Sequence, residues 1–344
     1  MSSDSPPLSV LEAWGLVDAR VELISSGHIN RTYRVDPPGH APLVLQRLSP
    51  IFGARVNEDI EAITAELERA GLLTPRLVRT REGALWLETD DGPWRALTCI
   101  EGQTLLRVDS PARCAEAGAL LGRFHAALWR CGHRFRHLRL GVHDTPRHLA
   151  TLREALDRGA DHRLYAEVAP VGLAILEEAG QVGIPGDLPL RVVHGDPKIS
   201  NVIFGPDGAA LALVDLDTLA RMPLPVELGD ALRSWCAPAG EEQEGPFDLA
   251  LYGAALDGYA AGVGQRPTEA ERAAIPDGVA LISVELAARF CADALLESYF
   301  GWDRTRFGSA AEHNLARARS QLFLARAVGT QLDEMRRIAR RWGA

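Results

Sequence analysis

The chain has 344 residues, 47% of them hydrophobic and 24% charged, and its formal net charge is −9. This is globular composition with room for two lobes, and the acidic balance argues against a protein that binds nucleic acid. No apolar run is long enough to span a membrane, the start MSSDSPPLSV does not resemble a signal peptide, and the five cysteines are scattered. We therefore expect a cytoplasmic protein with no membrane or nucleic-acid partner.

The first hundred residues read as strands with one helix. Apolar residues recur at helical spacing over 56–70, which predicts an amphipathic helix with an acidic outer face. Alternating apolar residues bounded by turn residues predict five short strands, over residues 19–25, 31–35, 42–48, 84–88 and 94–99.

The composition changes after residue 102. A long helix is predicted over 112–130, and most of the chain from 145 onward is rich in Ala, Leu, Glu and Arg and is predicted to be helical. Short strands and turns return over 190–217. We therefore predict an α+β fold with a small antiparallel-sheet lobe over 1–100, with one helix, and a larger, mainly helical lobe over 101–344, hinged near residue 100.

The most informative stretch is His-Gly-Asp-Pro-Lys-Ile-Ser-Asn at residues 194–201. A predicted strand over 190–193 ends in a loop that presents Asp196. Asn201 follows five residues later, where the loop can bring its amide oxygen beside the same site.

A second motif, Val-Asp-Leu-Asp at 214–217, follows a turn at 205–208 and a predicted strand over 209–214. This strand returns the chain to deliver Asp215 next to Asn201. The pattern combines one carboxylate facing a nucleophile with two oxygen ligands for a hard divalent cation, which is what phosphoryl transfer needs.

With these motifs the chain resembles the aminoglycoside phosphotransferase and choline kinase superfamily, and most of all its N-acetylhexosamine 1-kinase-like branch. The matching segments are SGHINRTYRV, LVLQRLSP, HGDPKISNVIF, LVDLDT, ELGDALRS, ARF, SYF and HNLARARSQ. The resemblance implies a bilobal protein-kinase-like fold, in which residues 1–100 bind ATP and residues 101–344 carry the catalytic and substrate residues. The implied cofactors are ATP and Mg²⁺.

The resemblance also implies catalytic and metal roles. Asp196 would orient the substrate hydroxyl for in-line attack and take its proton late. Asn201 and Asp215 would hold Mg²⁺ against the phosphate oxygens. Lys198 would reach the transferring γ-phosphate as a point charge. His194 is expected to hold the loop in place.

Four residues are expected to meet the nucleotide through their backbone or a tight turn. Ser26 and Gly27 lie in the connection between the first two strands, where related kinases bind phosphate. The hinge backbone at Thr98 and Ile100 would meet the adenine edge, an expectation that rests on strand order alone.

The third strand departs from the protein-kinase pattern, because Gln46 stands where the phosphate-binding lysine is expected. Either Gln46 binds the nucleotide as a neutral donor, or a bulge turns the neighbouring Arg47 inward. The supporting residue of the helix is one of three glutamates, Glu58, Glu61 and Glu66.

The substrate residues are expected to be Arg289, Tyr299 and His28. In sugar sites aromatic faces pack on the ring while Arg or His donates to hydroxyl groups. The predicted reaction is therefore transfer of a phosphoryl group from ATP to a monosaccharide or amino sugar. The anomeric hydroxyl of an N-acetylhexosamine is the preferred acceptor, because it is somewhat more acidic than an ordinary alcohol.

Two kinds of alternative stay open. The same fold can phosphorylate an aminoglycoside, choline, homoserine or a methylthio sugar, and the excess of acids over bases in residues 241–300 would suit a polycationic antibiotic. The chain can also be a nucleotide-binding pseudokinase without turnover.

Overall fold

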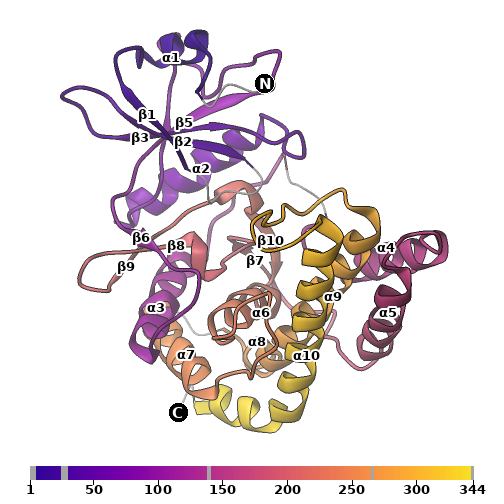
Figure 1. Ribbon diagram of the computed structural model, residues 1–344. Coiled ribbons are helices and arrows are strands. Elements are labelled where there is room, and N and C mark those ends of the chain that lie inside the picture. The colour runs from indigo at the N-terminus through magenta and orange to yellow at the C-terminus, as the bar shows by residue number, and fades with distance from the viewer. Residues whose placement is uncertain (1–4, 25–29, 138–140, 265–266, 342–344) are drawn as a thin grey trace.

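The structure is a computed structural model that describes residues 5–24, 30–137, 141–264 and 267–341. Three residues expected at the site, Ser26, Gly27 and His28, lie outside the described residues. In Figure 1 a small lobe built on a sheet stands above a larger lobe built mostly of helices, and the short strands between them face the small lobe.

The small lobe is one antiparallel sheet with the strand order β1-β2-β3-β5-β4. Its strands are β1 (Arg20–Ile24), β2 (Arg31–Asp36), β3 (Leu43–Arg47), β4 (Leu77–Val78) and β5 (Trp94–Thr98), and its helices are α1 (Leu8–Trp14) and α2 (Val56–Arg69). The pairing of β3 with both neighbours is continuous, so Gln46 stands opposite Thr32 on one side and Arg95 on the other.

The helix predicted over 56–70 is confirmed as α2. Its apolar stripe, which includes Ile60, Ile63 and Leu67, is buried in the main core of the molecule together with Leu121 of the large lobe. The sheet has a separate core around Tyr33. Helix α2 therefore packs on the large lobe, while the side chains of the sheet pack in the separate core around Tyr33.

Two predictions for the small lobe are wrong. Residues 84–88 form no strand, and only Leu87 makes an isolated bridge, to Trp94. The reason is that β4 occupies the sheet edge beside β5, pairing Leu77 with Leu97. The lobe also has two helices rather than one, because the segment that precedes β1 forms α1.

The large lobe contains the remaining helices. They are α3 (Pro111–Leu128), α4 (Thr145–Arg158), α5 (Tyr165–Ala179), α6 (Leu224–Trp235), α7 (Leu249–Val263), α8 (Glu269–Ala273), α9 (Ile275–Leu296) and α10 (Ala310–Arg341). Its short strands and 3₁₀ turns are β6 (Gln103–Thr104), β7 (Leu190–Val193), η1 (Ile199–Asn201), β8 (Val202–Phe204), β9 (Ala210–Leu213), η2 (Leu216–Thr218) and β10 (Ala220–Pro223).

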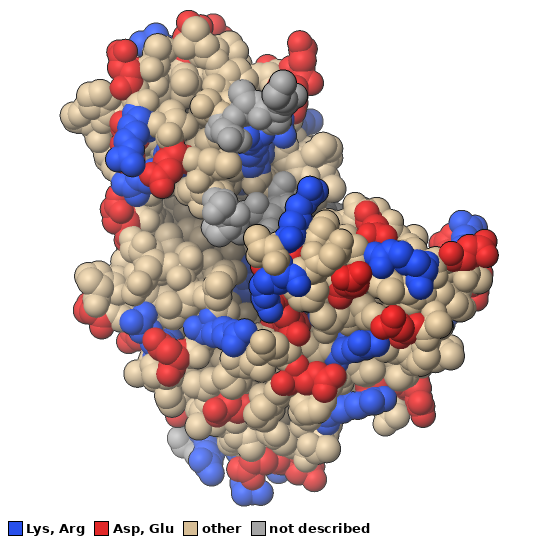
Figure 2. All heavy atoms as spheres, in the orientation of Figure 1, with Lys and Arg blue, Asp and Glu red and all other residues tan. Residues whose placement is uncertain are grey.

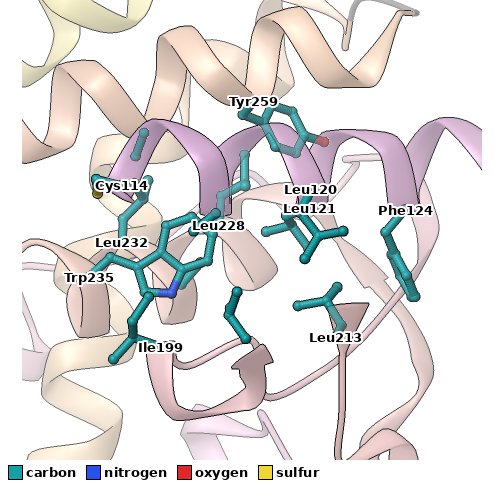
Figure 3. Close-up of a cluster of buried hydrophobic side chains, with 14 of the residues drawn as sticks. Cys114, Leu120, Leu121, Phe124, Ile199, Leu213, Leu228, Leu232, Trp235 and Tyr259 are labelled. Carbon is teal, nitrogen blue, oxygen red and sulfur yellow. The ribbon is translucent and has the colours of Figure 1, made fainter. Parts of the chain in front are cut away.

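The core of the large lobe reaches directly beneath these short strands. Figure 3 shows side chains of α3, among them Leu121, directed toward those of α6, among them Leu232. Ile199 and Leu213, from the two motif segments, enter the same cluster. Both motif segments are therefore anchored in the core at their apolar residues, which leaves their polar side chains on the opposite side.

The predicted α+β architecture, a small sheet lobe and a larger helical lobe, is confirmed. Division of the chain at residue 100 stays a prediction. Within the described ranges, each helix is either too short or too polar to cross a lipid bilayer.

Candidate active site

The loop of residues 194–201, here called the HGD loop, follows β7 and is held from below by α6. The carboxylate of Glu227 accepts the backbone N–H groups of His194 and Gly195, each at 2.9 Å. The indole N–H of Trp235 donates to the carbonyl of Pro197 at 2.9 Å. Burial opposes the charge of Glu227, but nearby His125 outweighs it, and the pKa of Glu227 is lowered. The lowered pKa favours the ionised carboxylate, which accepts both backbone N–H groups at the start of the loop.

Gly195 allows the sharp turn that this anchoring requires. Its φ is +83°, and a Cβ at this position would lie 2.2 Å from the carbonyl oxygen of Thr218. Thr218 in turn donates its hydroxyl to the carbonyl of His194 at 2.9 Å. The HGD loop and η2 therefore pass backbone against backbone.

His194 is buried, as expected of a residue that holds the loop. Its Nε2 lies 2.9 Å from the carbonyl oxygen of Val214, and its Nδ1 accepts the amide N–H of Asp196 at 3.3 Å. These partners assign the proton to Nε2. The imidazole thus ties the HGD loop to the strand that leads to Asp215.

Asp196 has a cation and an amide against its carboxylate. The ammonium of Lys198 lies 2.7 Å from Oδ2, and Nδ2 of Asn201 donates to the carbonyl oxygen of Asp196 at 2.8 Å and to Oδ2 at 3.3 Å. Burial opposes the charge of Lys198, but Asp196 and Asp215 outweigh it and raise the pKa of the ammonium. Lys198, expected at the γ-phosphate, is in this structure the partner of Asp196.

Asp215 and Asn201 leave oxygen atoms available. The backbone N–H of Val214 donates to the carbonyl of Asn201 at 2.9 Å, which sets the two segments side by side. No described residue donates to the Oδ1 atom of Asn201 or to the Asp215 carboxylate. Burial, together with the charge of Asp217, raises the pKa of Asp215, although Lys198 lowers it.

These oxygens fit a hard divalent cation. Mg²⁺ takes oxygen ligands, and its positive charge would favour the ionised form of Asp215, whose pKa burial and Asp217 raise. Asp196 lies close enough for its charge to act on Asp215. The described residues contain no cluster of three or more His, Cys, Asp and Glu side chains placed for a metal, so the site depends on the amide oxygen of Asn201.

Asp217 belongs to a buried network that the sequence did not reveal. Its two carboxylate oxygens accept Nη1 and Nη2 of Arg95 at 2.6 and 2.9 Å, and Oδ2 also accepts Nδ2 of Asn30 at 2.7 Å. Asp217 is therefore held as an anchor between the small lobe and η2. A role as a metal ligand does not fit this geometry, because Arg95 and Asn30 donate to both of its oxygens.

Gln46 is the next member of this network. Its Oε1 accepts two N–H groups of Arg95, at 2.9 and 2.7 Å, and its Nε2 donates to the hydroxyl of Thr32 at 3.0 Å. The hypothesis of a bulge at Arg47 is wrong, because the register of β3 is continuous on both sides. Contact between Gln46 and a nucleotide stays a prediction.

The helix residue that supports the network is Asn57, whose Oδ1 accepts Nη1 of Arg95 at 3.2 Å. We expected a glutamate here, and that expectation is wrong. Each of the three glutamates is paired with an arginine on or near α2, in the pairs Glu58–Arg55, Glu61–Arg79 and Glu66–Arg69.

The expected hinge follows the end of β5. The backbone of Thr98 is bound to Arg76, its N–H donating to the carbonyl at 2.9 Å, and Cys99 donates to Pro42 at 3.2 Å. Among the described residues, none accepts the N–H of Ile100 through its backbone. Ile100 therefore offers a free donor where an adenine edge is expected.

A buried histidine supports the HGD loop from the opposite side. Nδ1 of His143 lies 2.9 Å from Oε1 of Glu285, and Nε2 lies 3.2 Å from the carbonyl oxygen of Gly195. Both partners are acceptors, so both ring nitrogens carry protons. Burial opposes this charge, but Glu285 outweighs it and the pKa of His143 is raised.

Two of the expected substrate residues lie together near His143. Arg289 stands one helical turn after Glu285 on α9, and its guanidinium lies 5.8 Å from the centre of the Tyr299 ring and 5.5 Å from that of Phe300. Arg289 is half-buried and has no hydrogen bond or ion pair with a described residue. The site therefore holds a cation beside aromatic faces.

The segment that carries Tyr299 is shaped by Asp293, which sequence reasoning missed. Its carboxylate accepts the backbone N–H groups of Tyr299 and Phe300 at 2.9 and 2.8 Å and the amide of Asn314 at 3.0 Å. Asn314 belongs to the HNLARARSQ motif, which explains why that motif accompanies SYF. Figure 2 shows that the surface is hollowed between the two lobes.

Comparisons with known proteins relate the chain to a family of phosphotransferases. The family model described as phosphotransferase enzyme family, abbreviated APH, matches residues 20–263. The chain is 32% identical over 225 residues to a homoserine kinase of Methylorubrum populi and 30% identical over 211 residues to one of Caulobacter sp. strain K31. The two alignments cover 62% and 60% of this chain and the same shares of those relatives, so the chain spans about three fifths of their length.

Solved structures resemble the chain over most of its length. An amicoumacin kinase in complex with AMP-PNP, Ca²⁺ and Ami has a TM-score of 0.59 at 16% identity and covers 88% of this chain and 87% of its own. An aminoglycoside phosphotransferase from Alicyclobacillus acidocaldarius has a TM-score of 0.61 at 14% identity and covers 97% and 98%. At these identities the likeness shows a bilobal protein-kinase-like fold. Since the matching family model includes the sheet, the HGD loop and Asp215, the chain belongs to the phosphotransferase enzyme family.

Proposed function

We propose that this chain is a kinase that transfers the γ-phosphoryl group of ATP to a hydroxyl of a small polar molecule. The observation that carries the proposal is the convergence of Asp196, Asn201 and Asp215. The carboxylate of Asp196 is partly exposed and accepts hydrogen bonds. Asn201 and Asp215 lie beside it and have side-chain oxygen atoms to which no described residue donates.

Each residue has a task in this reaction. Asp196 accepts the acceptor hydroxyl as a hydrogen bond, orients it for in-line attack and takes its proton late. Asn201 and Asp215 hold Mg²⁺, which supplies positive charge to the phosphate oxygens when bound. Lys198 forms an ion pair with Asp196 before the acceptor binds, and its ammonium moves toward the γ-phosphate as negative charge develops there.

The nucleotide is proposed to lie between the sheet and the HGD loop. The N–H of Ile100 and the backbone at Thr98 recognise adenine, and Gln46 faces the phosphates. The similar fold of a kinase whose structure contains AMP-PNP and Ca²⁺ supports a nucleotide with a divalent cation at this place.

The preferred acceptor is the anomeric hydroxyl of an N-acetylhexosamine or amino sugar. Tyr299 and Phe300 offer ring faces for the apolar side of a pyranose, and Arg289 donates to its hydroxyl or acetamido oxygens. A second candidate is homoserine, the substrate in the names of the two curated relatives. Its carboxylate suits the guanidinium of Arg289, which can bind it with two parallel hydrogen bonds.

An aminoglycoside is a weaker candidate, because the acids of residues 241–300 already have partners. Glu242 is paired with Arg306 and His313, and Glu241 with Arg233. Further pairs are Glu271–Arg191, Asp277–Arg336 and Glu285–His143. Few of these carboxylates remain to bind a polycation.

An acceptor panel tests the proposal. Release of ADP is measured with N-acetylglucosamine, N-acetylgalactosamine, homoserine, choline and kanamycin, and phosphorus NMR identifies the phosphorylated position. Asp196→Asn is expected to lower turnover by about 10²–10⁴-fold while ADP binding is kept. The proposal is contradicted if the wild-type protein binds ADP and Mg²⁺ but produces no ADP from ATP with any acceptor. That result would support a pseudokinase.

Arg289→Gln separates the two preferred acceptors. With homoserine the variant loses a charge-assisted pair to a carboxylate, so we expect KM to rise by about tenfold or more. With a neutral sugar a glutamine still donates to hydroxyl oxygens, and the increase is expected to be smaller. Equal effects on both acceptors would remove Arg289 from acceptor recognition.

A further inference from the structure

We infer that Arg95 acts as a positioning residue of the metal site, holding Asp217 so that Asp215 is presented to the cation. This inference rests on the proposed function, because it assigns a task within the same site. The buried cation that the small lobe contributes is therefore Arg95 on β5. The facing residue on β3 is the neutral Gln46.

The ion pair between Arg95 and Asp217 is deeply buried, with side chains 2% and 1% exposed. Removing two charges from water is costly, so burial alone does not show that the pair stabilises the fold. The pair has another property that an apolar contact lacks. Its two parallel hydrogen bonds, Nη1 to Oδ1 and Nη2 to Oδ2, set the direction of the Asp217 carboxylate.

All five N–H groups of Arg95 have an acceptor. Nε and one N–H of Nη2 donate to Gln46, one N–H of Nη1 donates to Asn57, and the remaining two donate to Asp217. No donor is left for a phosphate oxygen. The geometry therefore points to action through Asp217 and not to direct contact with the nucleotide.

Asp217 is well placed to act on Asp215. Asp217 is the second residue of η2, and Asp215 comes just before η2. Asp215 has a left-handed backbone with φ of 66°, which costs energy for any residue with a Cβ. Such a conformation persists only when its surroundings hold it. Arg95 and Asn30 hold η2 from the small lobe, while Thr218 binds the HGD loop from the other end.

The same pair also joins the two lobes. Arg95 belongs to the sheet, Asn57 to α2, and Asp217 to the segment next to the metal site. A shift of the sheet relative to the large lobe must therefore either carry η2 with it or break the pair. The metal ligand is coupled in this way to the position of the nucleotide-binding lobe.

The first experiment needs no turnover. The rise in unfolding temperature caused by ADP is measured with and without Mg²⁺ for the wild type, for Arg95→Lys and for the control Arg191→Lys. Arg191 is matched to Arg95, because it also makes a two-bond ion pair with a buried carboxylate, but its partner is Glu271 of α8 and not Asp217. We expect Arg95→Lys to lose most of the Mg²⁺-dependent part of the rise while the part due to ADP alone is kept, and Arg191→Lys to keep both.

The second experiment is a double-mutant cycle with Arg95→Met and Asp217→Asn, read as the Mg²⁺ concentration that gives half of the maximal ADP affinity. Each single change is expected to raise this concentration by about 10–100-fold, the usual cost of losing a residue that orients a metal ligand. The double variant is expected to cost little more than one single change, because both act through one pair. It also leaves no unpaired buried charge, so it provides a folded protein if a single variant unfolds.

Three results overturn the inference. They are a double variant with the Mg²⁺ dependence of the wild type, effects of the two changes that add, and an Arg95 variant that weakens ADP equally with and without Mg²⁺. The last result would make Arg95 a phosphate ligand. A wild type that shows the Mg²⁺-dependent rise but no phosphoryl transfer contradicts the proposed function alone, so the two failures are distinguishable.

Discussion

The ammonium of Lys198 lies 2.7 Å from the Oδ2 atom of Asp196, and it is the only lysine side chain in the sequence. Every other basic residue among the 37 lysines and arginines is an arginine. A guanidinium is a planar fork, whereas an ammonium is a compact point charge that can turn from one partner to another. A residue that must move from Asp196 to a phosphate is better served by the ammonium.

Removal of this charge tests that role. Lys198→Met is expected to lower kcat by about 10²–10³-fold, because a charge that stabilises the transition state is lost, while KM for ATP changes much less. Lys198→Arg is expected to restore little of the activity. A variant with unchanged kcat and a raised KM for ATP would limit Lys198 to binding of the ground state.

The single lysine also permits chemical labelling. An amine-reactive reagent can modify one side chain, besides the N-terminal amine, and mass spectrometry of peptides separates the two. Because Asp196 raises the pKa of Lys198, Asp196→Asn is expected to increase the fraction of neutral amine and so the labelling rate. Slower labelling of the variant would contradict the ion pair.

Gly195→Ala tests the close passage between the HGD loop and η2. Gly83→Ala is the matched control, since its φ of +85° is nearly that of Gly195 at +83°, but a Cβ there meets nothing within 4 Å. The control is expected to cost about 1–2 kcal/mol of unfolding free energy, the penalty of the left-handed backbone. Gly195→Ala is expected to cost clearly more in urea unfolding, because the Cβ collides with Thr218. Equal costs would show that the loop has room to adjust.

Glu227→Ala removes the anchor of the HGD loop. The N–H groups of His194 and Gly195 are left without an acceptor, and we expect about 1–3 kcal/mol of destabilisation for each buried group, together with a lower kcat. Asp248→Ala serves as the control, because that carboxylate also accepts two backbone N–H groups, at the start of α7. It is expected to lower stability by about 1 kcal/mol and to leave kcat unchanged. A Glu227 variant that is destabilised but retains full kcat would separate stability from catalysis at this residue.

The pair of His143 and Glu285 predicts a dependence of stability on pH. The raised pKa of His143 means that the folded protein holds this proton more tightly than the unfolded chain does. The contribution of the pair is therefore complete below the ordinary pKa of histidine and is lost as the pH rises through the raised value. At the acidic end the contribution is lost as the pH falls through the pKa of Glu285. Burial raises this pKa, but the hydrogen bond and charge of His143 outweigh burial and lower it.

The measurement is the unfolding free energy of the wild type minus that of Glu285→Gln. We expect this difference to shrink as the pH rises from about 6 to about 9. Other charged groups that act on His143 are Asp230, which raises its pKa, and Arg289, which lowers it. His148 lies nearby, and burial lowers its pKa, which favours its neutral form. A constant difference would mean that His143 is not charged in the folded protein.

Sequence reasoning brought the candidate catalytic and metal residues together because their geometry is local. Asp196 and Asn201 are five residues apart in one loop, and a single turn with two short strands returns the chain to Asp215. The helix over 56–70 was predictable for the same reason, since its apolar stripe follows the helical period. The proposed substrate residues Arg289 and Tyr299 were chosen through motifs, but their proximity to His143 and the HGD loop was not predicted.

The sequence by itself thus determined the order of the lobes and which residues are candidates for catalysis and for a metal. Only the tertiary structure determined what holds them. Arg95 and Asp217 are 122 residues apart, and His143 and Glu285 142 apart, so no spacing in the sequence connects either pair. Such contacts depend on how separately folded segments pack, and an isolated arginine, histidine or glutamate in the sequence carries no sign of its partner.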